Sequence, residues 1–314
     1  MKVHDGATGA EATMSIFDGV VYSDLFDCAL RLDEVVRYSG RAVGPEEVVA
    51  ALASSSLGGA VVRKDGYFTV SGREGLVEQR VETQSRALRL QRRAQRVNRV
   101  LRLVPFVRGL ILTGSVAAEA AAEDADVDLL VIVSPGRLAF VFLVLGGFSR
   151  LTRRRVFCAN FYLSEDRLRV ERHNLFVARE IAQARPLDED AERFFEINDW
   201  IRDFLPNASP SRALGGRRPG ARWMQRLLEW PFKGRFGRWC ESFAGRVARR
   251  RIDAHYRAAP EDQRTMVSDR FAAGHELRFH NHPDLRGLRA RYEAHRASLR
   301  TSLDATTGQM ESER

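Results

Sequence analysis

The apolar positions in the first quarter of the chain predict three helices followed by a β-hairpin. Apolar residues recur at helical spacing over Ile16–Leu25. A second short helix is expected from Leu32, and a third from Pro45, because proline is favoured in the first helical turn. Two apolar runs then flank Asp65-Gly66, a pair that supplies the positive φ angles of a tight turn. This order of elements is typical of a winged helix, expected over residues 14–77.

The charge on the third helix argues against DNA binding by this unit. The helix that would enter the DNA groove spans Pro45–Ser54 and carries Glu46 and Glu47 but no basic residue. Phosphates would repel these carboxylates, and the hairpin adds only Arg63 and Lys64. We therefore expect the unit to pack against its neighbours or to contact a protein.

A long amphipathic helix is expected over Glu78–Leu103, ended by Pro105, which lacks the backbone N–H of a helical residue. Its leucines and valines predict a partly buried face. Its arginines form either a solvated face of a connecting helix or a surface for phosphates or RNA, and both interpretations stay open; they are Arg86, Arg89, Arg92, Arg93, Arg96, Arg99 and Arg102.

Two strongly apolar runs predict neighbouring strands, Phe106–Thr113 and Asp126–Val133. Between them lie Gly114 and Ser115 and a helix of small residues expected over Val116–Ala122. Gly114 allows the backbone to approach a phosphate closely, and the Ser115 hydroxyl can donate a hydrogen bond to it.

Asp126 and Asp128 are two positions apart, so on a strand both carboxylates would point to one face. Paired carboxylate oxygens suit Mg²⁺, which also takes oxygens from substrate phosphates. The pattern therefore predicts a site for a nucleotide and a divalent metal.

The sequence from Pro105 to Val133 resembles the DNA-polymerase-β-type nucleotidyltransferase superfamily, whose signature is Gly-Ser, a short helix, and Asp-x-Asp before an apolar strand. The resemblance implies that Gly114 and Ser115 contact the β- and γ-phosphates of a nucleoside triphosphate, and that Asp126 and Asp128 are the catalytic metal ligands. It implies Mg²⁺, or Mn²⁺ in its place, as cofactor.

The chain departs from this superfamily at the third carboxylate, which the superfamily places on a neighbouring strand. The strand expected here is Arg155–Tyr162, and its candidate position holds the neutral Asn160. Glu171, on an expected return strand Leu168–Glu171, is the alternative third position. A further candidate metal cluster combines His280, His282 and Asp284.

The stretch Arg212–Arg257 has the strongest charge in the chain. It holds 13 basic residues against three acidic ones, in a protein with a formal net charge of +9. Tryptophan and phenylalanine residues are interleaved with these charges. Three interpretations remain open: helices docked on the protein with a solvated face, a surface for RNA or another nucleic acid, and a surface for a membrane or a protein partner.

The composition of the chain indicates which broad class of protein it belongs to. Of 314 residues 44% are hydrophobic, enough for a folded core. Three widely spaced cysteines, no secretory signal and no apolar run of membrane-spanning length favour a cytoplasmic protein. We expect an α+β fold with a short mixed sheet. The expected division is a flexible 1–13, a winged-helix-like 14–77, a nucleotidyltransferase core 78–206, an arginine-rich helical 207–303 and a flexible tail 304–314.

The expected function is Mg²⁺-dependent transfer of a nucleoside monophosphate from a nucleoside triphosphate, with ATP as the expected donor, to a hydroxyl of an acceptor. The acceptor could be RNA, a protein or a small molecule. The alternative is a catalytically degenerate module that binds nucleotide or regulates a partner, and the neutral Asn160 favours it.

Overall fold

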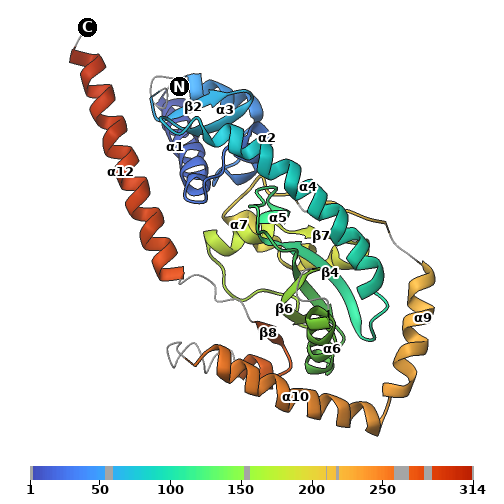
Figure 1. Cartoon of the computed structure of the whole chain (residues 1–314). Helices are drawn as coiled ribbons and strands as arrows, with labels where there is room; N and C mark the ends of the chain where they lie inside the picture. The colour runs from blue at the N-terminus through green and yellow to red at the C-terminus, as the bar shows by residue number, and fades with distance from the viewer. Residues whose placement is uncertain are drawn as a thin grey trace.

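The computed structural model is a mixed α+β protein built around a five-stranded sheet (Figure 1). The long helix α4 (Leu76–Leu101) runs from the N-terminal unit down one side of the sheet. The helices α9 (Pro219–Glu229) and α10 (Arg235–His255) lie at the opposite end of the molecule from the N-terminal unit. The residues that the structure describes are 3–53, 59–151, 156–209, 211–216, 219–257, 269–278 and 285–312.

The N-terminal unit contains the expected helices and hairpin and one further strand. Its elements in chain order are α1 (Val3–Asp24), β1 (Leu30–Arg31), α2 (Leu32–Tyr38), α3 (Pro45–Ala53), β2 (Val61–Lys64) and β3 (Tyr67–Val70). The three strands form an antiparallel sheet in the order β1-β3-β2. Asp65 and Gly66 have φ angles of 51° and 83°, so both turn residues are left-handed as the hairpin requires.

The first helix begins at Val3, earlier than the sequence pattern indicated at Met14. The intervening stretch contains three alanines and no proline, the residue that disfavours a helix most strongly. The structure therefore extends α1 through residues that we expected to be a flexible N-terminus.

The central sheet has the strand order β7-β4-β5-β6-β8. β4 runs antiparallel to β5 and β7, β5 runs parallel to β6, and β6 runs antiparallel to β8. The expected strands are confirmed as β4, β5 and β6. The bounds are β7 (Arg185–Pro186), β4 (Val107–Thr113), β5 (Asp128–Val133), β6 (Cys158–Ser164) and β8 (Glu276–Arg278).

Both faces of the sheet are buried, which explains why its strands are continuously apolar rather than alternating. Leu110, Leu129 and Val131 belong to one core, which they share with α4, α6 (Leu138–Leu151) and α10 (Arg235–His255). Ile111 and Leu130 belong to a second core with the N-terminal unit. In the described part of the chain the other helices are α5 (Gly114–Ala117), α7 (Leu175–Gln183), η1 (Glu189–Ala191), α8 (Arg193–Ile197), η2 (Asp199–Asp203), η3 (Trp230–Phe232) and α12 (Leu285–Ser312).

Two expected elements are corrected by the structure. The helix expected over Val116–Ala122 is only the short α5, because the chain turns at Glu119, whose φ is 58°. The stretch Leu168–Glu171 is irregular rather than a return strand. The edge of β6 that it would have occupied is taken by β8, from a part of the chain more than a hundred residues later.

The C-terminal part of the chain packs on both preceding units. β8 completes the central sheet, whereas α12 lies against α1, where Arg296 pairs with Asp18 and His295 contacts Asp24. The helical α12 also continues through residues that we expected to be a flexible tail. Among the described residues, no helix is both long enough and apolar enough to cross a membrane.

Candidate functional site at the β4–β5 edge

The Gly-Ser bend and Asp128 face each other across two paired strands. Thr113, the last residue of β4, pairs with Asp128, the first residue of β5. Gly114 then turns the chain with a φ of 69°, and a Cβ placed on it would lie 2.9 Å from Asp128 Oδ2. A side chain at position 114 would therefore be strained and would collide with the carboxylate, so glycine brings the bend close to Asp128.

Asn160 lies beside Asp128 because β6 is irregular at this point. The pairing of β5 with β6 shifts between Leu129 and Leu130, and Asn160 is skipped in the register. Its Nδ2 donates a 2.7 Å hydrogen bond to Asp128 Oδ1, and its Oδ1 accepts from Cys158 Sγ at 2.8 Å. The residue in the third position is thus a hydrogen-bond donor to the aspartate rather than a second negative charge.

Asp126 and Ser115 are both exposed at the same edge. Asp126 precedes β5, which begins at Asp128, so the two carboxylates do not both belong to the strand as the spacing predicted. Ser115 follows Gly114 in α5, and its backbone carbonyl accepts from the N–H of Ala120 at 2.8 Å. Gly114 and Ser115 are both solvent-exposed, so a ligand can reach this bend.

The structure does not bring Glu171 to this site. The Glu171 side chain is 71% exposed and pairs with Arg270, which also pairs with Glu276 of β8. Glu276 is opposite Leu163, near the carboxyl end of β6, whereas Asp128 is opposite Cys158 at the amino end. Five residues of strand separate these ends, about 16 Å, so Glu171 cannot serve as the third carboxylate.

A buried ionic cluster that the sequence analysis missed holds the loop after α5. The carboxylate of Glu119 accepts from Arg31 at 2.8 Å, Gln84 at 2.8 Å and Arg185 at 2.6 Å. Burial alone would raise the pKa of Glu119, but the hydrogen bonds from Arg31 and Gln84 and the charge of Arg185 outweigh it and hold that pKa below its ordinary value. A lone glutamate in a run of alanines was the one signal in the sequence.

Side chains from α4 and β7 also hold the backbone of this loop. Arg185 Nε donates to the carbonyl of Ala117 at 3.1 Å, and Arg80 donates to that of Ala118 at 3.1 Å. Gln91 donates to the carbonyl of Val116, and Arg86 donates to that of Ala121.

Arg86 therefore has a structural role, whereas Arg89, Arg92 and Arg99 of the same helix are exposed. The short α5 and its loop are fixed in place before any ligand binds.

The residue types at this edge suit one magnesium ion better than two. Asp126 and Asp128 supply hard carboxylate oxygens, and Mg²⁺ is commonly bound by one or two carboxylates together with substrate phosphates. Asn160 turns its NH₂ group toward Asp128 and so adds no donor oxygen there. Within the described part of the chain, no three His, Cys, Asp or Glu residues are grouped to hold a metal. His280, His282 and Asp284 lie outside the described residues.

The geometry of this edge stands without support from relatives. Comparison of the chain with models of protein families, with curated proteins and with solved structures finds no match.

Proposed function

We propose that the chain binds a nucleoside triphosphate with Mg²⁺ at the β4–β5 edge and transfers its nucleoside monophosphate to a hydroxyl of an acceptor. The observation that carries the proposal is the approach of the left-handed Gly114 to the carboxylate of Asp128. It joins a solvent-exposed bend with a carboxylate of the type that binds Mg²⁺, in the order and spacing of the Gly-Ser and Asp-x-Asp signature.

In the proposed reaction, the acceptor oxygen forms a bond to the α-phosphorus, and the bond between that phosphorus and the bridging oxygen breaks. Pyrophosphate leaves, and the hydroxyl proton passes to solvent. Mg²⁺, when bound, would neutralise phosphate charge and lower the pKa of the attacking hydroxyl. Asp126 and Asp128 would hold it, and Gly114 and Ser115 would orient the β- and γ-phosphates through the backbone and the Ser115 hydroxyl.

The test is incubation of the full chain with α-labelled nucleotides and Mg²⁺, with and without fractions of RNA, protein and small molecules. Label should appear on a product with the natural chain and disappear with Asp128→Asn. Asp65→Asn, an exposed aspartate in the β2–β3 turn, is the matched control and should keep full transfer. Equal transfer by Asp128→Asn would refute the catalytic role of this edge.

A second candidate function, a nucleotide-binding module without catalysis, is favoured by one observation. Asn160 occupies the third position and donates to Asp128, so the edge has less negative charge than a two-ion site needs. The two functions differ in the same assay. A binding module would gain thermal stability with Mg-ATP through ligand binding while no label reached a product.

We further propose that the N-terminal unit is a winged helix that serves packing rather than DNA recognition. The element order α1-β1-α2-α3-β2-β3 supports this assignment. In α3, Val48 is fully buried, whereas Glu46 and Glu47 are exposed. A duplex DNA oligonucleotide should therefore bind no better than its backbone charge allows, with no preference among sequences.

A further inference from the structure

The helix α9 buries polar side chains and exposes apolar ones, which is the reverse of an ordinary surface helix. Its polar residues Gln225 and Glu229, one turn apart, are buried. Gln225 donates to the carbonyls of Val104 and Val107, and Glu229 accepts from the Phe106 N–H at 2.8 Å. An amphipathic helix normally buries its apolar stripe. Here polar contacts with the backbone of residues 104–107 attach the helix to the protein, and its apolar stripe faces the solvent.

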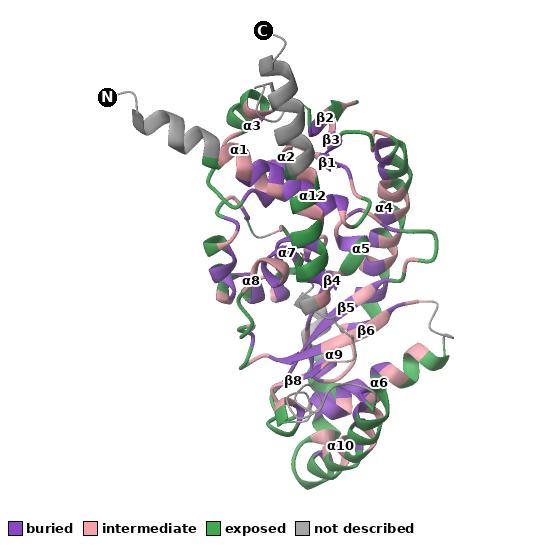
Figure 2. Ribbon diagram, turned by 90° about the vertical axis from the view of Figure 1, so that its left-hand side faces the viewer, coloured by how far each residue is buried: buried purple, intermediate pink, exposed green. Residues whose placement is uncertain are grey.

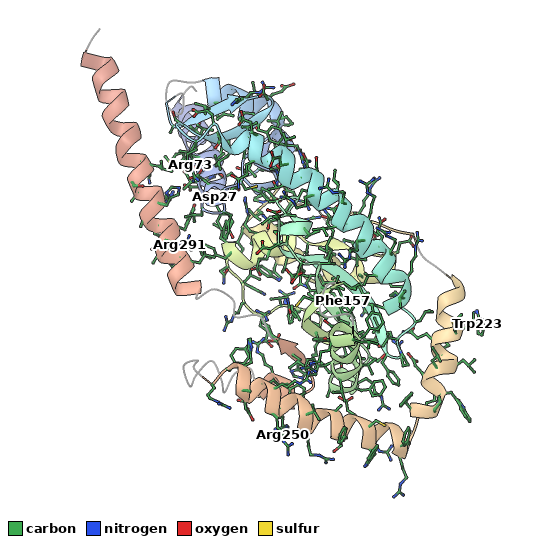
Figure 3. The ribbon with its side chains drawn as sticks, in the orientation of Figure 1. Asp27, Arg73, Phe157, Trp223, Arg250 and Arg291 are labelled. Carbon is green, nitrogen blue, oxygen red and sulfur yellow. The ribbon has the colours of Figure 1, made fainter. Side chains whose placement is uncertain are left out.

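The apolar side chains of α9 and the adjoining η3 are correspondingly exposed. Trp223 is 62% exposed, Leu227 63% and Trp230 71%. In Figure 3, Trp223 projects from α9 away from the body of the molecule. By contrast, Trp200 in η2 is only 5% exposed. The exposed tryptophans of the chain therefore all lie in this segment and in the helix that follows it.

The next helix, α10, also keeps its aromatic residues outside. It packs on α6 through small and aliphatic residues, Ala244, Ala248 and Ile252, which are all buried. Its opposite side is exposed along much of its length (Figure 2). The rings on that side, Phe236, Trp239 and Phe243, stack in sequence at centroid distances of 6.1 and 6.0 Å, and Phe236 also stacks at 5.8 Å on the half-buried Phe232 of η3.

Positive charge surrounds these rings, and most negative charge is turned inward. Glu229 is bound to Arg108, and Glu241 accepts the N–H groups of Ala139 and Phe140 at the start of α6. Among the described residues 219–257, Asp253 is the one exposed carboxylate. The exposed cations of the same stretch are Arg226, Lys233, Arg235, Arg238, Arg246, Arg249, Arg250 and Arg257.

We infer that α9, η3 and the outer side of α10, called here the aromatic-cationic surface, bind the anionic surface of a lipid bilayer. Interfacial helices place tryptophan, phenylalanine and leucine at the boundary of headgroups and acyl chains, with arginine among the headgroups. No described helix can span a bilayer, so the contact is peripheral. This inference does not depend on the proposed nucleotidyl transfer.

Two other occupants fit the surface less well. Single-stranded nucleic acid is usually bound in a cationic groove with stacking aromatics. The aromatic-cationic surface instead lies on helices at the edge of the molecule, and the exposed Leu227 and Leu228 offer bases nothing to stack on. A second copy of the chain, paired through the same surface, would bring like charges together.

The test is flotation of the full chain with vesicles of phosphatidylcholine alone or mixed with phosphatidylglycerol. The natural chain should float with the anionic vesicles and be released by high salt. Its tryptophan emission should shift to the blue as exposed rings enter the interface.

Two triple variants measure separately the apolar and the ionic contributions to vesicle binding. Trp223→Ser with Trp230→Ser and Trp239→Ser should weaken partitioning by at least about tenfold, because binding scales with buried apolar area. Arg235→Gln with Arg238→Gln and Arg246→Gln should weaken it by about fivefold for each arginine removed.

Matched controls come from the exposed face of α4. Arg89→Gln with Arg92→Gln and Arg99→Gln removes the same charge elsewhere, and Val81→Ser with Leu88→Ser removes exposed apolar side chains elsewhere. Both controls should float as the natural chain does.

Several results would overturn the inference. They are no flotation of the natural chain with anionic vesicles, equal loss in the α4 controls, a labelled RNA oligonucleotide that binds where vesicles do not, or a dimer in light scattering that the tryptophan variant converts to monomer.

Discussion

Asn160 sets the charge of the candidate site, since it donates to Asp128 where a carboxylate would repel it. Asn160→Asp should therefore destabilise the chain without metal by about 1–2 kcal/mol, because two carboxylates in contact cannot both ionise easily. With Mg²⁺ and ATP, the variant should gain a larger shift in melting temperature than the natural chain. Melting curves in EDTA, in Mg²⁺ and in Mg-ATP measure both effects.

The control for this change is Glu171→Gln, at the far end of β6 in contact with Arg270. It should leave the response to Mg-ATP unchanged. An Asn160→Asp variant that is no more sensitive to Mg²⁺ than the natural chain would show that metal does not bind at this edge.

The left-handed bend at Gly114 can be tested against a second glycine of similar conformation. Gly114→Ala should lower the free energy of unfolding by about 1–3 kcal/mol and abolish stabilisation by Mg-ATP, because the new Cβ meets the Asp128 carboxylate. Gly66 has a φ of 83°, but a Cβ added there by Gly66→Ala would meet no atom within 4 Å. It should show only the backbone strain and keep the ligand response. Equal ligand responses in the two variants would contradict a phosphate-binding role for the bend.

Between elements, Glu119 joins β1, α4 and β7 through the groups that hold its carboxylate. Glu119→Gln should lower the free energy of unfolding by about 2–3 kcal/mol near neutral pH, because charged hydrogen bonds to Arg31 and Arg185 are lost. Urea denaturation measures the difference, with the exposed Glu82→Gln on α4 as control.

The pH dependence of this difference has a definite sign. The folded-state pKa of Glu119 is held below its ordinary value, so its stabilisation is complete above the unfolded pKa, near 4.3, and is lost as pH falls through the folded value. The gap between the natural chain and Glu119→Gln should be constant from neutral pH to about pH 5 and shrink below about pH 4. A gap that grew on acidification would show that Glu119 is not held as a carboxylate.

Sequence patterns predicted those elements that local periodicity determines. The helices from Leu32 and Pro45, the hairpin around Asp65, and the apolar strands all appear near their expected places. The strand β8 could not be predicted, because its three residues are defined by a partner more than a hundred positions away. The direction in which α9 faces was equally hidden, since its apolar stripe has the same spacing whether it faces the core or the solvent.

Local sequence patterns likewise predicted one part of the candidate site and missed the rest. Gly114 directly follows the last residue of β4, and Asp128 begins β5, so pairing of those strands was sufficient to bring them together. The contact of Asn160 depends on an irregular register in β6, which no local pattern encodes. The cluster around Glu119 draws its arginines from positions 66 and 88 residues away, beyond the reach of any short motif.

At the scale of the whole molecule, α12 closes the N-terminal unit. Tyr292 is 8% exposed, and its ring lies 5.9 Å from that of Tyr22 and 6.1 Å from that of Phe176. Tyr292→Ala should lower the free energy of unfolding by about 3 kcal/mol, as expected for removal of a buried aromatic ring. Phe26 is half-exposed, so Phe26→Ala should cost about half as much, roughly 1.5 kcal/mol, by proportion to its burial. Similar losses in both would mean that α12 does not pack as described.

The contact between α1 and α12 also sets an order of events during synthesis. Asp18 leaves the ribosome early, but its partner Arg296 is 278 residues further along the chain, and His295, which contacts Asp24, is 271 residues beyond Asp24. At ordinary rates of translation this delay is on the order of tens of seconds. Throughout that time the side of α1 that α12 will cover faces water, so the first helix to be made is among the last to find all of its partners.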